Sequence, residues 1–359
     1  MSAIDLDMDR VNQQIAEGWI SKRKHPTADL YIYNYTKRTQ YARHWTPETI
    51  ACRGLILDGN DQVVARGFDK FFNLSETPDT QIDALPDGPI EVTDKADGSL
   101  GILYWIGDEP HIATRGSFDG EQAVWATEWL RNHVDLMMLD LVTRAPKGGV
   151  TLLFEIIYPA NRVVLNYGDR AELVLIGARE TVTGRDLGYD HIEAAAGLLG
   201  VAIVPRLPHT SIHDLLPLVK TAKGIEGWVV RYPNGLRVKV KCEDYLALHR
   251  LVFGLTPERV RDAMLLDFDG FVANLPEELR PEVEQQASKI EDAVTCRMND
   301  IFAAFMDCTR RTTNASRKAF AQAVMQHYPQ DSKYLFALLD DRPVRDMVLK
   351  SLDLNEVFA

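Results

Sequence analysis

The pentapeptide KADGS at residues 95–99 contains a lysine that could act as a covalent nucleophile. A free lysine amine has a pKa near 10.4, so only about one molecule in a thousand is neutral at pH 7.4. An ammonium group has no lone pair, so a nucleophilic Lys95 needs a site that lowers its pKa by burial or by nearby cations. The pentapeptide by itself is weak evidence, because a charged turn between two strands has the same residue types.

A second segment, RVKVK at residues 237–241, alternates basic and apolar side chains. Successive side chains of a β-strand point to opposite faces, so the valines would pack on a core and the cations would line a cleft. Lys239 and Lys241 would then lower the pKa of Lys95 and stabilise negative charge on phosphate oxygens. The alternative interpretation is a solvated strand face.

Two carboxylates and two glycines complete the pattern. Glu155 and Glu226 each lie within a strongly apolar segment, where a carboxylate either points into a cleft or pairs with a cation. Mg²⁺ prefers oxygen ligands and retains water, so both could act through metal-bound waters or on ribose hydroxyls, the alternative being structural ion pairs. Gly98 and Gly227 would let the backbone approach a bound nucleotide closely, the alternative being a plain turn.

The order and spacing of these segments resemble those of the covalent nucleotidyltransferases, meaning polynucleotide ligases and capping enzymes. KADGS is similar to their motif I, FE at residues 154–155 to motif III, EGWVV to motif IV and VKVK to motif V. The finer resemblance is to the bacteriophage-type RNA ligase 1 family, the tRNA-repair ligases, and covers most of residues 30–250. Its segments are YNY at 33–35, CRGLILD at 52–58, DKFFNL at 69–74, PANRVVLNY at 159–167 and KVKCEDYLALH at 239–249.

The resemblance implies roles for further residues. The implied catalytic residues are Lys95, Asp97, Lys239 and Lys241. The implied nucleotide-binding residues are Tyr33, Arg53, Lys70, Phe72, Gly98, Arg115, Glu155, Glu226, Gly227, Lys239 and Lys241. Asp97 would orient Lys95 or a substrate hydroxyl, and the sequence does not decide which. Without the resemblance, Tyr33 and Phe72 would be interpreted as core aromatics.

One position departs from the family pattern. The family has a lysine where this chain has Arg115, in the segment TRGSF. Both side chains are cations, but a planar guanidinium does not replace a point charge without consequence.

The activity that the resemblance implies is ATP-dependent RNA ligation, in RNA or tRNA repair. Lys95 would take AMP from ATP, the AMP would pass to an RNA 5′-phosphate, and a 3′-hydroxyl would attack the activated end. The expected cofactors are ATP and Mg²⁺, with Mn²⁺ as a substitute, and the expected partner is RNA with these ends, such as a cleaved tRNA.

Two alternative functions have different sequence signatures from RNA ligation. A DNA ligase or capping-type nucleotidyltransferase would carry a β-rich OB domain after motif V. An inactive RNA-binding adaptor would have lost Lys95 or the two motif V lysines.

Composition limits the remaining possibilities. The chain has 359 residues, 46% of them hydrophobic, and a formal net charge of −12, which argues against non-specific coating of nucleic acid. No apolar run reaches the roughly 18 residues of a membrane helix, and MSAIDLDMDR does not resemble a secretory signal. None of the four cysteines forms a CxxC pair. We therefore expect a cytoplasmic protein without membrane partners, in the host cytoplasm if the source is viral.

The predicted elements form an α+β nucleotidyltransferase domain at residues 1–254, with antiparallel sheets around a nucleotide cleft, and an all-helical domain at 255–359. The second domain is a candidate RNA-specificity module. Strands are predicted at 55–58, 62–66, 100–106, 151–157, 173–180, 226–232 and 236–241, the last two as a hairpin through Pro233-Asn234-Gly235. Helices are predicted at 121–142, at 191–200 and along the apolar face that runs from Ile290 to Cys308.

Overall fold

The computed structural model describes residues 6–275, 279–312 and 316–358. The chain divides into two compact units, Met1–His249 and Arg250–Ala359. The sequence predicts this boundary at residue 254, because strand-like segments give way to purely helical patterns only there, where helix α8 (Glu243–Phe253) ends. No helix among the described residues is both long and apolar enough to cross a membrane.

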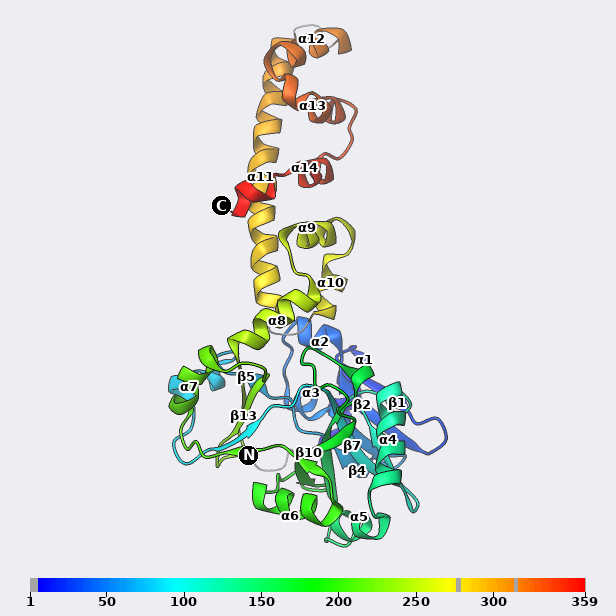
Figure 1. The fold of residues 1–359 in the computed structure, drawn as a ribbon. Helices are drawn as coiled ribbons and strands as arrows, with labels where there is room; N and C mark the ends of the chain where they lie inside the picture. The colour runs from blue at the N-terminus through cyan, green and yellow to red at the C-terminus, as the bar shows by residue number, and fades with distance from the viewer. Residues whose placement is uncertain (1–5, 276–278, 313–315, 359) are drawn as a thin grey trace. The chain divides into compact units, whose positions relative to one another are not determined.

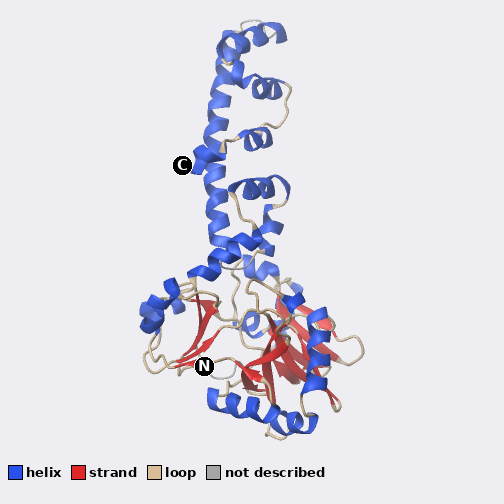
Figure 2. Cartoon of the chain, viewed as in Figure 1, coloured by secondary structure: helices blue, strands red, loops and turns tan. Residues whose placement is uncertain are grey.

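Unit 1 contains three sheets (Figures 1 and 2). The first sheet has the order β1-β2-β3-β4 and is antiparallel throughout. Its strands are β1 (Ile20–Lys24), β2 (Leu30–Tyr35), β3 (Arg53–Asp58) and β4 (Val63–Arg66).

The second sheet has the order β11-β10-β9-β7-β8. Its strands are β7 (Ser99–Ile106), β8 (Glu109–Ala113), β9 (Val150–Ile157), β10 (Glu172–Glu180) and β11 (Ala202–Ile203). The third sheet has the order β12-β6-β13-β14-β5, formed by β5 (Phe72–Asn73), β6 (Glu91–Asp94), β12 (Arg206–Leu207), β13 (Gly227–Arg231) and β14 (Arg237–Lys241).

The pairing within these two sheets is antiparallel except where β11 joins β10 and β5 joins β14. Each exception is a two-residue strand at a sheet edge, so the sheets are mixed rather than purely antiparallel as the sequence analysis expects. The predicted hairpin of β13 and β14 is confirmed, with Gly227 opposite Lys241 and Arg231 opposite Arg237.

Helices cover one face of the second sheet (Figure 1). They are α4 (Glu121–His133), α5 (Leu136–Thr143) and α6 (Tyr189–Leu199), and their apolar residues share a buried cluster with Leu103, Phe154, Ile156 and Leu173 of the strands. The other helices of unit 1 are α1 (Met8–Ala16), α2 (Lys37–Tyr41), α3 (Pro47–Ala51), α7 (Ile212–Thr221) and α8, with 3₁₀ turns at Pro78–Thr80, Ile82–Ala84 and Pro159–Asn161.

The single helix predicted at 121–142 is wrong, because the chain is extended at Val134. Asp135 then caps a new helix, its carboxylate accepting from the backbone N–H groups of Met137 and Met138 at 2.8 and 3.2 Å. A capping aspartate inside an apolar helical pattern marks a helix start, and the apolar periodicity conceals that signal. The predicted helix at 191–200 is confirmed as α6, which ends at Gly200 in the left-handed region.

The described residues of unit 2 form helices joined by loops, and no strand (Figure 2). Its helices are α9 (Pro257–Leu266), α10 (Phe268–Asn274), α11 (Arg280–Arg311), α12 (Arg317–His327), α13 (Ser332–Leu339), α14 (Arg345–Ser351) and α15 (Leu354–Phe358), with a 3₁₀ turn at Pro329–Asp331. Helix α11 packs against α9, α12, α13, α14 and α15. Its buried face includes Ile290, Val294, Ile301 and Cys308, as the spacing predicts.

The capping interaction at Asp135 gives a direct stability prediction. Asp135→Ala should lower the free energy of unfolding by about 1 kcal/mol, because two N–H groups of α5 lose their acceptor. Asp140→Ala on the same helix removes only an exposed pair with Arg144 and should cost less than about 0.5 kcal/mol. Urea denaturation of both variants measures the difference, and equal losses would contradict the capping role.

Candidate active site

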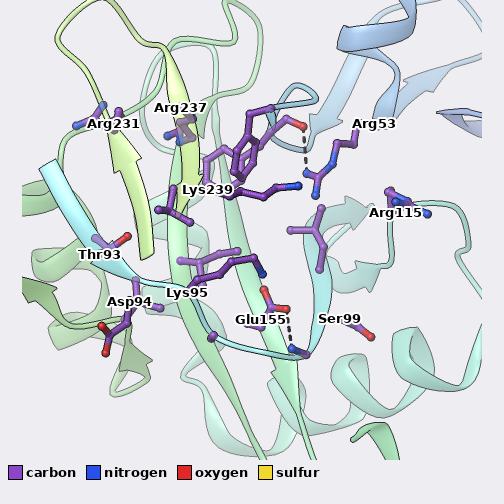
Figure 3. Close-up of a pocket in the computed structure, with 18 of the residues that line it drawn as sticks. Arg53, Thr93, Asp94, Lys95, Ser99, Arg115, Glu155, Arg231, Arg237 and Lys239 are labelled. Atoms are coloured by element: carbon purple, nitrogen blue, oxygen red, sulfur yellow. Dashed lines mark hydrogen bonds between the residues drawn. The ribbon is translucent and has the colours of Figure 1, made fainter. Parts of the chain in front are cut away.

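A cavity of about 590 Å³ opens between the second and third sheets of unit 1 (Figure 3). The third sheet contributes Thr93, Val229, Arg231 and the basic residues of β14, and the second contributes Leu100, Glu155 and Ile176. Residues 95–98 connect β6 of the third sheet to β7 of the second. The KADG segment therefore crosses between the sheets along the cavity wall.

Strand β14 presents its cations to this cavity. Arg237, Lys239 and Lys241 line the wall, while Val238 and Val240 are buried on the opposite face. This is the arrangement that the alternation in RVKVK predicts. It follows that the cationic surface is a property of the strand and not of a mobile loop.

Lys95 lies in this wall, bound to Glu226. Its Nζ donates to Glu226 Oε2 at 2.8 Å, and Lys241 Nζ lies 2.8 Å from the other oxygen, Oε1. The Lys95 side chain is 20% exposed and that of Glu226 only 3%. One buried carboxylate therefore joins the proposed nucleophile to the basic strand.

The charge state of Lys95 differs from the sequence-based expectation. Burial alone would lower its pKa, but the Glu226 carboxylate, and Glu155 beside it, outweigh burial and raise the pKa above the ordinary lysine value. Burial likewise opposes ionisation of Glu226, yet Lys95 and Lys241 hold the pKa of Glu226 below its usual range. The prediction that neighbouring lysines lower the pKa of Lys95 is wrong for this state of the protein.

The reason lies in the strand order. Lys95 directly follows β6, and β13 lies between β6 and β14 in the third sheet. The backbone N–H of Lys95 donates to the carbonyl oxygen of Gly227 at 2.9 Å. This register places Glu226, the residue before β13, closer to the amine than either lysine of β14.

Glu155 faces the same cavity from the second sheet (Figure 3). Its Oε1 accepts the backbone N–H of Gly98 at 3.0 Å. Burial, together with the charges of Glu226 and Asp97, exceeds the opposing effect of Lys95 and raises the pKa of Glu155 to about 7. This carboxyl group therefore changes charge near neutral pH.

Two arginines from other elements reach the cavity. Arg53 Nη1 donates to the carbonyl oxygen of Phe68 at 3.3 Å, and Arg115 Nη1 donates to the Tyr35 hydroxyl at 3.1 Å. Both residues line the wall. With β14, they give the cavity lining an excess of basic side chains over Glu91, Asp94 and Glu155, despite the net negative charge of the chain.

Comparison with known proteins assigns the family. The model of the RNA ligase family matches residues 51–246, which is more than half of the chain. The chain belongs to this RNA ligase family. The phage-type resemblance is therefore confirmed, and residues 95–99, Glu155, Glu226 and strand β14 all lie inside the matched range.

Individual relatives agree with the family. An RNA ligase of Rhodothermus phage RM378 is 24% identical over 403 aligned positions, which cover 90% of this chain and 87% of the relative. A tRNA ligase of Candida albicans is 43% identical over 95 residues, covering 22% of this chain and 11% of the relative.

Among solved structures, a protein of Aquifex aeolicus assigned as an ATP-dependent DNA ligase matches with a TM-score of 0.50 and 12% identity. The match covers 94% of this chain and all of the other. At this identity the likeness shows the fold alone, and the predicted nucleotidyltransferase architecture followed by helices is confirmed.

Asp97 of this RNA ligase turns away from the cavity. Its Oδ2 accepts the backbone N–H groups of Val164 and Leu165 at 3.0 and 2.7 Å, and its Oδ1 accepts the hydroxyl of Tyr245 at 2.9 Å. The carboxylate thus makes no hydrogen bond to Lys95. These contacts hold the KADG segment from the side away from the cavity, and the expected orientation of Lys95 by a hydrogen bond to Asp97 is not seen. The alternative, that Asp97 orients a substrate hydroxyl, stays a prediction.

Five of the nucleotide-binding residues implied by the resemblance do not line the cavity, namely Tyr33, Lys70, Phe72, Glu226 and Gly227. Glu226 and Gly227 contact Lys95 directly, whereas the other three lie further out. Tyr33 is fully buried in a cluster with Leu55 and Leu57, as the core alternative predicts. Lys70 is 5% exposed, and its Nζ lies 4.7 Å from the centre of the Phe72 ring. Tyr33, Lys70 and Phe72 therefore pack around the site and do not form its surface.

Phe71 is a cavity residue that the sequence analysis missed. It lies between two cations, with the Arg53 guanidinium carbon 5.6 Å and Lys239 Nζ 5.1 Å from the centre of its ring. The segment DKFFNL signals an aromatic residue here, but two adjacent phenylalanines point to different sides, and only the fold decides which one faces the cavity.

The acidic residues fit a water-rich metal site and not a closed protein cage. Among the described residues, no three His, Cys, Asp or Glu side chains are placed to hold one ion. Glu155 lines the cavity, whereas both oxygens of Glu226 contact lysines. Mg²⁺ bound by one or two carboxylates, water and substrate phosphates suits such a donor set.

Gly227 admits no other residue without strain. Its φ is +140°, and an added Cβ would lie 2.0 Å from the carbonyl oxygen of Val240. Gly227→Ala should therefore cost at least about 3 kcal/mol of unfolding free energy and displace the Lys95 amide from its acceptor. Gly197→Ala in α6 meets nothing within 4 Å and should stabilise by about 0.5–1 kcal/mol. Thermal or urea unfolding compares the pair, and a neutral Gly227→Ala would refute this account.

The raised pKa of Glu155 predicts a pH dependence. The folded chain binds this proton more tightly than the unfolded chain, whose carboxyl has a pKa of 4.5, so the stabilisation is complete below about pH 4.5 and is lost as pH rises through about 7. Glu155→Gln removes this ionisation. As pH rises from 5 to 8, the free energy of unfolding of this variant should therefore increase relative to that of wild type. Glu109→Gln, at an exposed site, should show no such trend. Urea denaturation at pH 5 and pH 8 measures this change in unfolding free energy. The same pH dependence of stability in Glu155→Gln and wild type would contradict the raised pKa.

Proposed function

We propose that this RNA ligase uses ATP, forms a covalent lysyl-AMP at Lys95, and joins RNA 5′-phosphate and 3′-hydroxyl ends. The observation that carries the proposal is the position of Lys95. Its amine lies in the wall of a cationic cavity, beside a strand that presents Arg237, Lys239 and Lys241 to the same space. A polyphosphate is the ligand that this charge and the family relationship favour.

The first step requires the Lys95 amine to lose one proton. In the ligand-free arrangement Glu226 holds the ammonium form. Once the proton has passed to solvent, the nitrogen attacks the α-phosphorus, a P–N bond forms, and the P–O bond to pyrophosphate breaks. Lys239 and Lys241 would stabilise the charge on the phosphate oxygens, since preformed cations act best where charge develops.

Glu155 and Glu226 would hold a divalent metal ion, Mg²⁺ or Mn²⁺, through bound water. Its positive charge would oppose the hold of the carboxylates on the Lys95 proton and would neutralise phosphate oxygens. Any direct ligation by Glu226 would first require its contact with Lys95 or Lys241 to break, since both of its oxygens face lysines.

The RNA steps rest on the relatives. The Rhodothermus phage relative is named an RNA ligase and the Candida albicans relative a tRNA ligase. These names support RNA as the substrate and a cleaved tRNA as one candidate. Transfer of AMP to the RNA 5′-phosphate forms an anhydride, and attack by the 3′-hydroxyl then releases AMP and makes the phosphodiester.

Incubation with α-labelled ATP and Mg²⁺, followed by denaturation, tests the first step. Wild type should retain label on the chain, and Lys95→Ala should lose it. Lys95→Arg keeps a cation beside Glu226 and should fold normally but also lose the label, because arginine stays protonated. Lys147→Ala, at an exposed site, should label like wild type. Label on either Lys95 variant would place the nucleophile elsewhere.

The second step is tested with 5′-phosphorylated oligonucleotides. Wild type should convert a single-stranded RNA to a circle or a joined product and leave the matched DNA largely unsealed. Chelation of the metal should stop the labelling, and Mg²⁺ or Mn²⁺ should restore it. Preferential sealing of DNA ends would overturn RNA as the substrate.

A further inference from the structure

A second, smaller cavity lies in unit 1 on the side of the KADG segment opposite to the first. Its volume is about 160 Å³, and Asp97, which turns away from the first cavity, lines it. The other wall is the loop that follows β9, including Asn161, Arg162, Asn166 and Tyr167. This loop is the PANRVVLNY segment, to which the proposed reaction assigns no role.

The loop is bound tightly to the nucleophile segment. Besides the two backbone N–H groups that donate to Asp97, the Tyr167 hydroxyl accepts the backbone N–H of Asp97 at 2.9 Å. The Ser99 hydroxyl donates to Asn161 Oδ1 at 3.1 Å, and Asn161 Nδ2 donates to the carbonyl oxygen of Ile156 at 2.8 Å. A group bound by this loop would therefore be held at a fixed position relative to Lys95.

Three charged residues line this cavity. The Asp97 carboxylate accepts hydrogen bonds from the protein, Arg170 pairs with Glu172, and the third is Arg162. Its Nε donates to the carbonyl oxygen of Val164 at 3.2 Å, which orients the guanidinium. Among the described residues no carboxylate lies within ion-pair distance of it. By contrast, Arg231 and Arg237 of the first cavity pair with Glu91 and Asp186. An oriented arginine without an acidic partner, in a chain of net charge −12, is suited to bind an anion.

We propose that this second cavity binds a backbone phosphate of the RNA strand, with Arg162 as the phosphate ligand. The inference rests on the proposed function. At about 160 Å³ the cavity is smaller than the 300–1,000 Å³ typical of whole small-molecule ligands, which suits a phosphate with part of its ribose. The Asn161 amide is engaged by Ser99 and Ile156, and Asn166 Oδ1 accepts the backbone N–H of Gly168, so the Asn166 amide nitrogen and the Tyr167 ring are the groups beside Arg162 that suit a ribose-phosphate.

The position explains why an RNA strand would be held there. The first cavity holds ATP in the proposed reaction, and an RNA end must approach the adenylate on Lys95 to accept it. A phosphate bound behind residues 95–99 would anchor the strand through the same segment that carries the nucleophile. An ATP phosphate is the other source of this chemistry, so the test must separate the two.

Arg162→Ala in the full-length chain separates them. Binding of a 5′-phosphorylated oligoribonucleotide should weaken about tenfold, as expected for loss of a charged hydrogen bond. The slope of log K against log salt should become shallower by roughly 0.7, the value for one single-strand phosphate. Only RNA binding should weaken. The KM for ATP, measured by self-labelling of the chain, should be the same as in wild type.

Two further variants control for structure. Arg162→Lys keeps the charge and should recover most of the salt slope, which a merely structural arginine would not. Arg144→Ala removes an exposed arginine paired with Asp108 and Asp140, and should leave RNA affinity and salt slope unchanged.

The outcomes distinguish this inference from the proposed function. If wild type labels and seals RNA but Arg162→Ala keeps the wild-type affinity and slope, the phosphate site is refuted alone. A raised KM for ATP would assign the cavity to ATP instead, and an equal loss of labelling and RNA binding would make Arg162 structural. Failure of wild type to label with ATP would refute the proposed function itself.

Discussion

The buried carboxylate of Glu226 is the contact around which the site is organised. Each of its oxygens lies 2.8 Å from a lysine, Lys95 on one side and Lys241 on the other. A carboxylate with so little exposure would not remain ionised without such partners. Lys95 follows β6, Glu226 precedes β13, and Lys241 is the last residue of β14. The Glu226 carboxylate therefore connects three neighbouring strands of the third sheet. Removing it would leave two cations facing one another at the centre of the site.

The same contact sets the reactivity of the protein before substrate arrives. Glu226 keeps Lys95 protonated, so the amine is positioned but not nucleophilic. The segment around it is fixed from both sides, by Glu226 and Gly227 in front and by Asp97, Tyr167 and Tyr245 behind. In the proposed reaction, the binding of ATP and metal would therefore have to change the charge around Lys95 before the amine could lose its proton.

Much of the local structure could be predicted from the sequence. The valine and lysine alternation of β14 placed its cations on one face, and the spacing from Ile290 to Cys308 placed the buried face of α11. The aromatic segment before residue 36 conceals strand β2, because its tyrosines alternate with Leu30, Ile32 and Asn34 and neither face is plainly polar. The sequence predicts one helix at 121–142 where the structure has two, because the apolar periodicity continues through the cap at Asp135.

The sequence by itself determined strands β3, β4, β7, β9, β10, β13 and β14, the two-part organisation, the family and most of the residues that surround the site. Tertiary structure alone decided which of them meet. β13 separates β6 from β14, so Lys95 contacts Glu226 before any cation, and its pKa rises where the sequence suggested a fall. Asp97 faces the loop after β9, and Tyr33, Lys70 and Phe72 support the site from outside its wall. Strand order and the direction of a side chain across a sheet depend on partners more than a hundred residues away, and local periodicity contains no information about them.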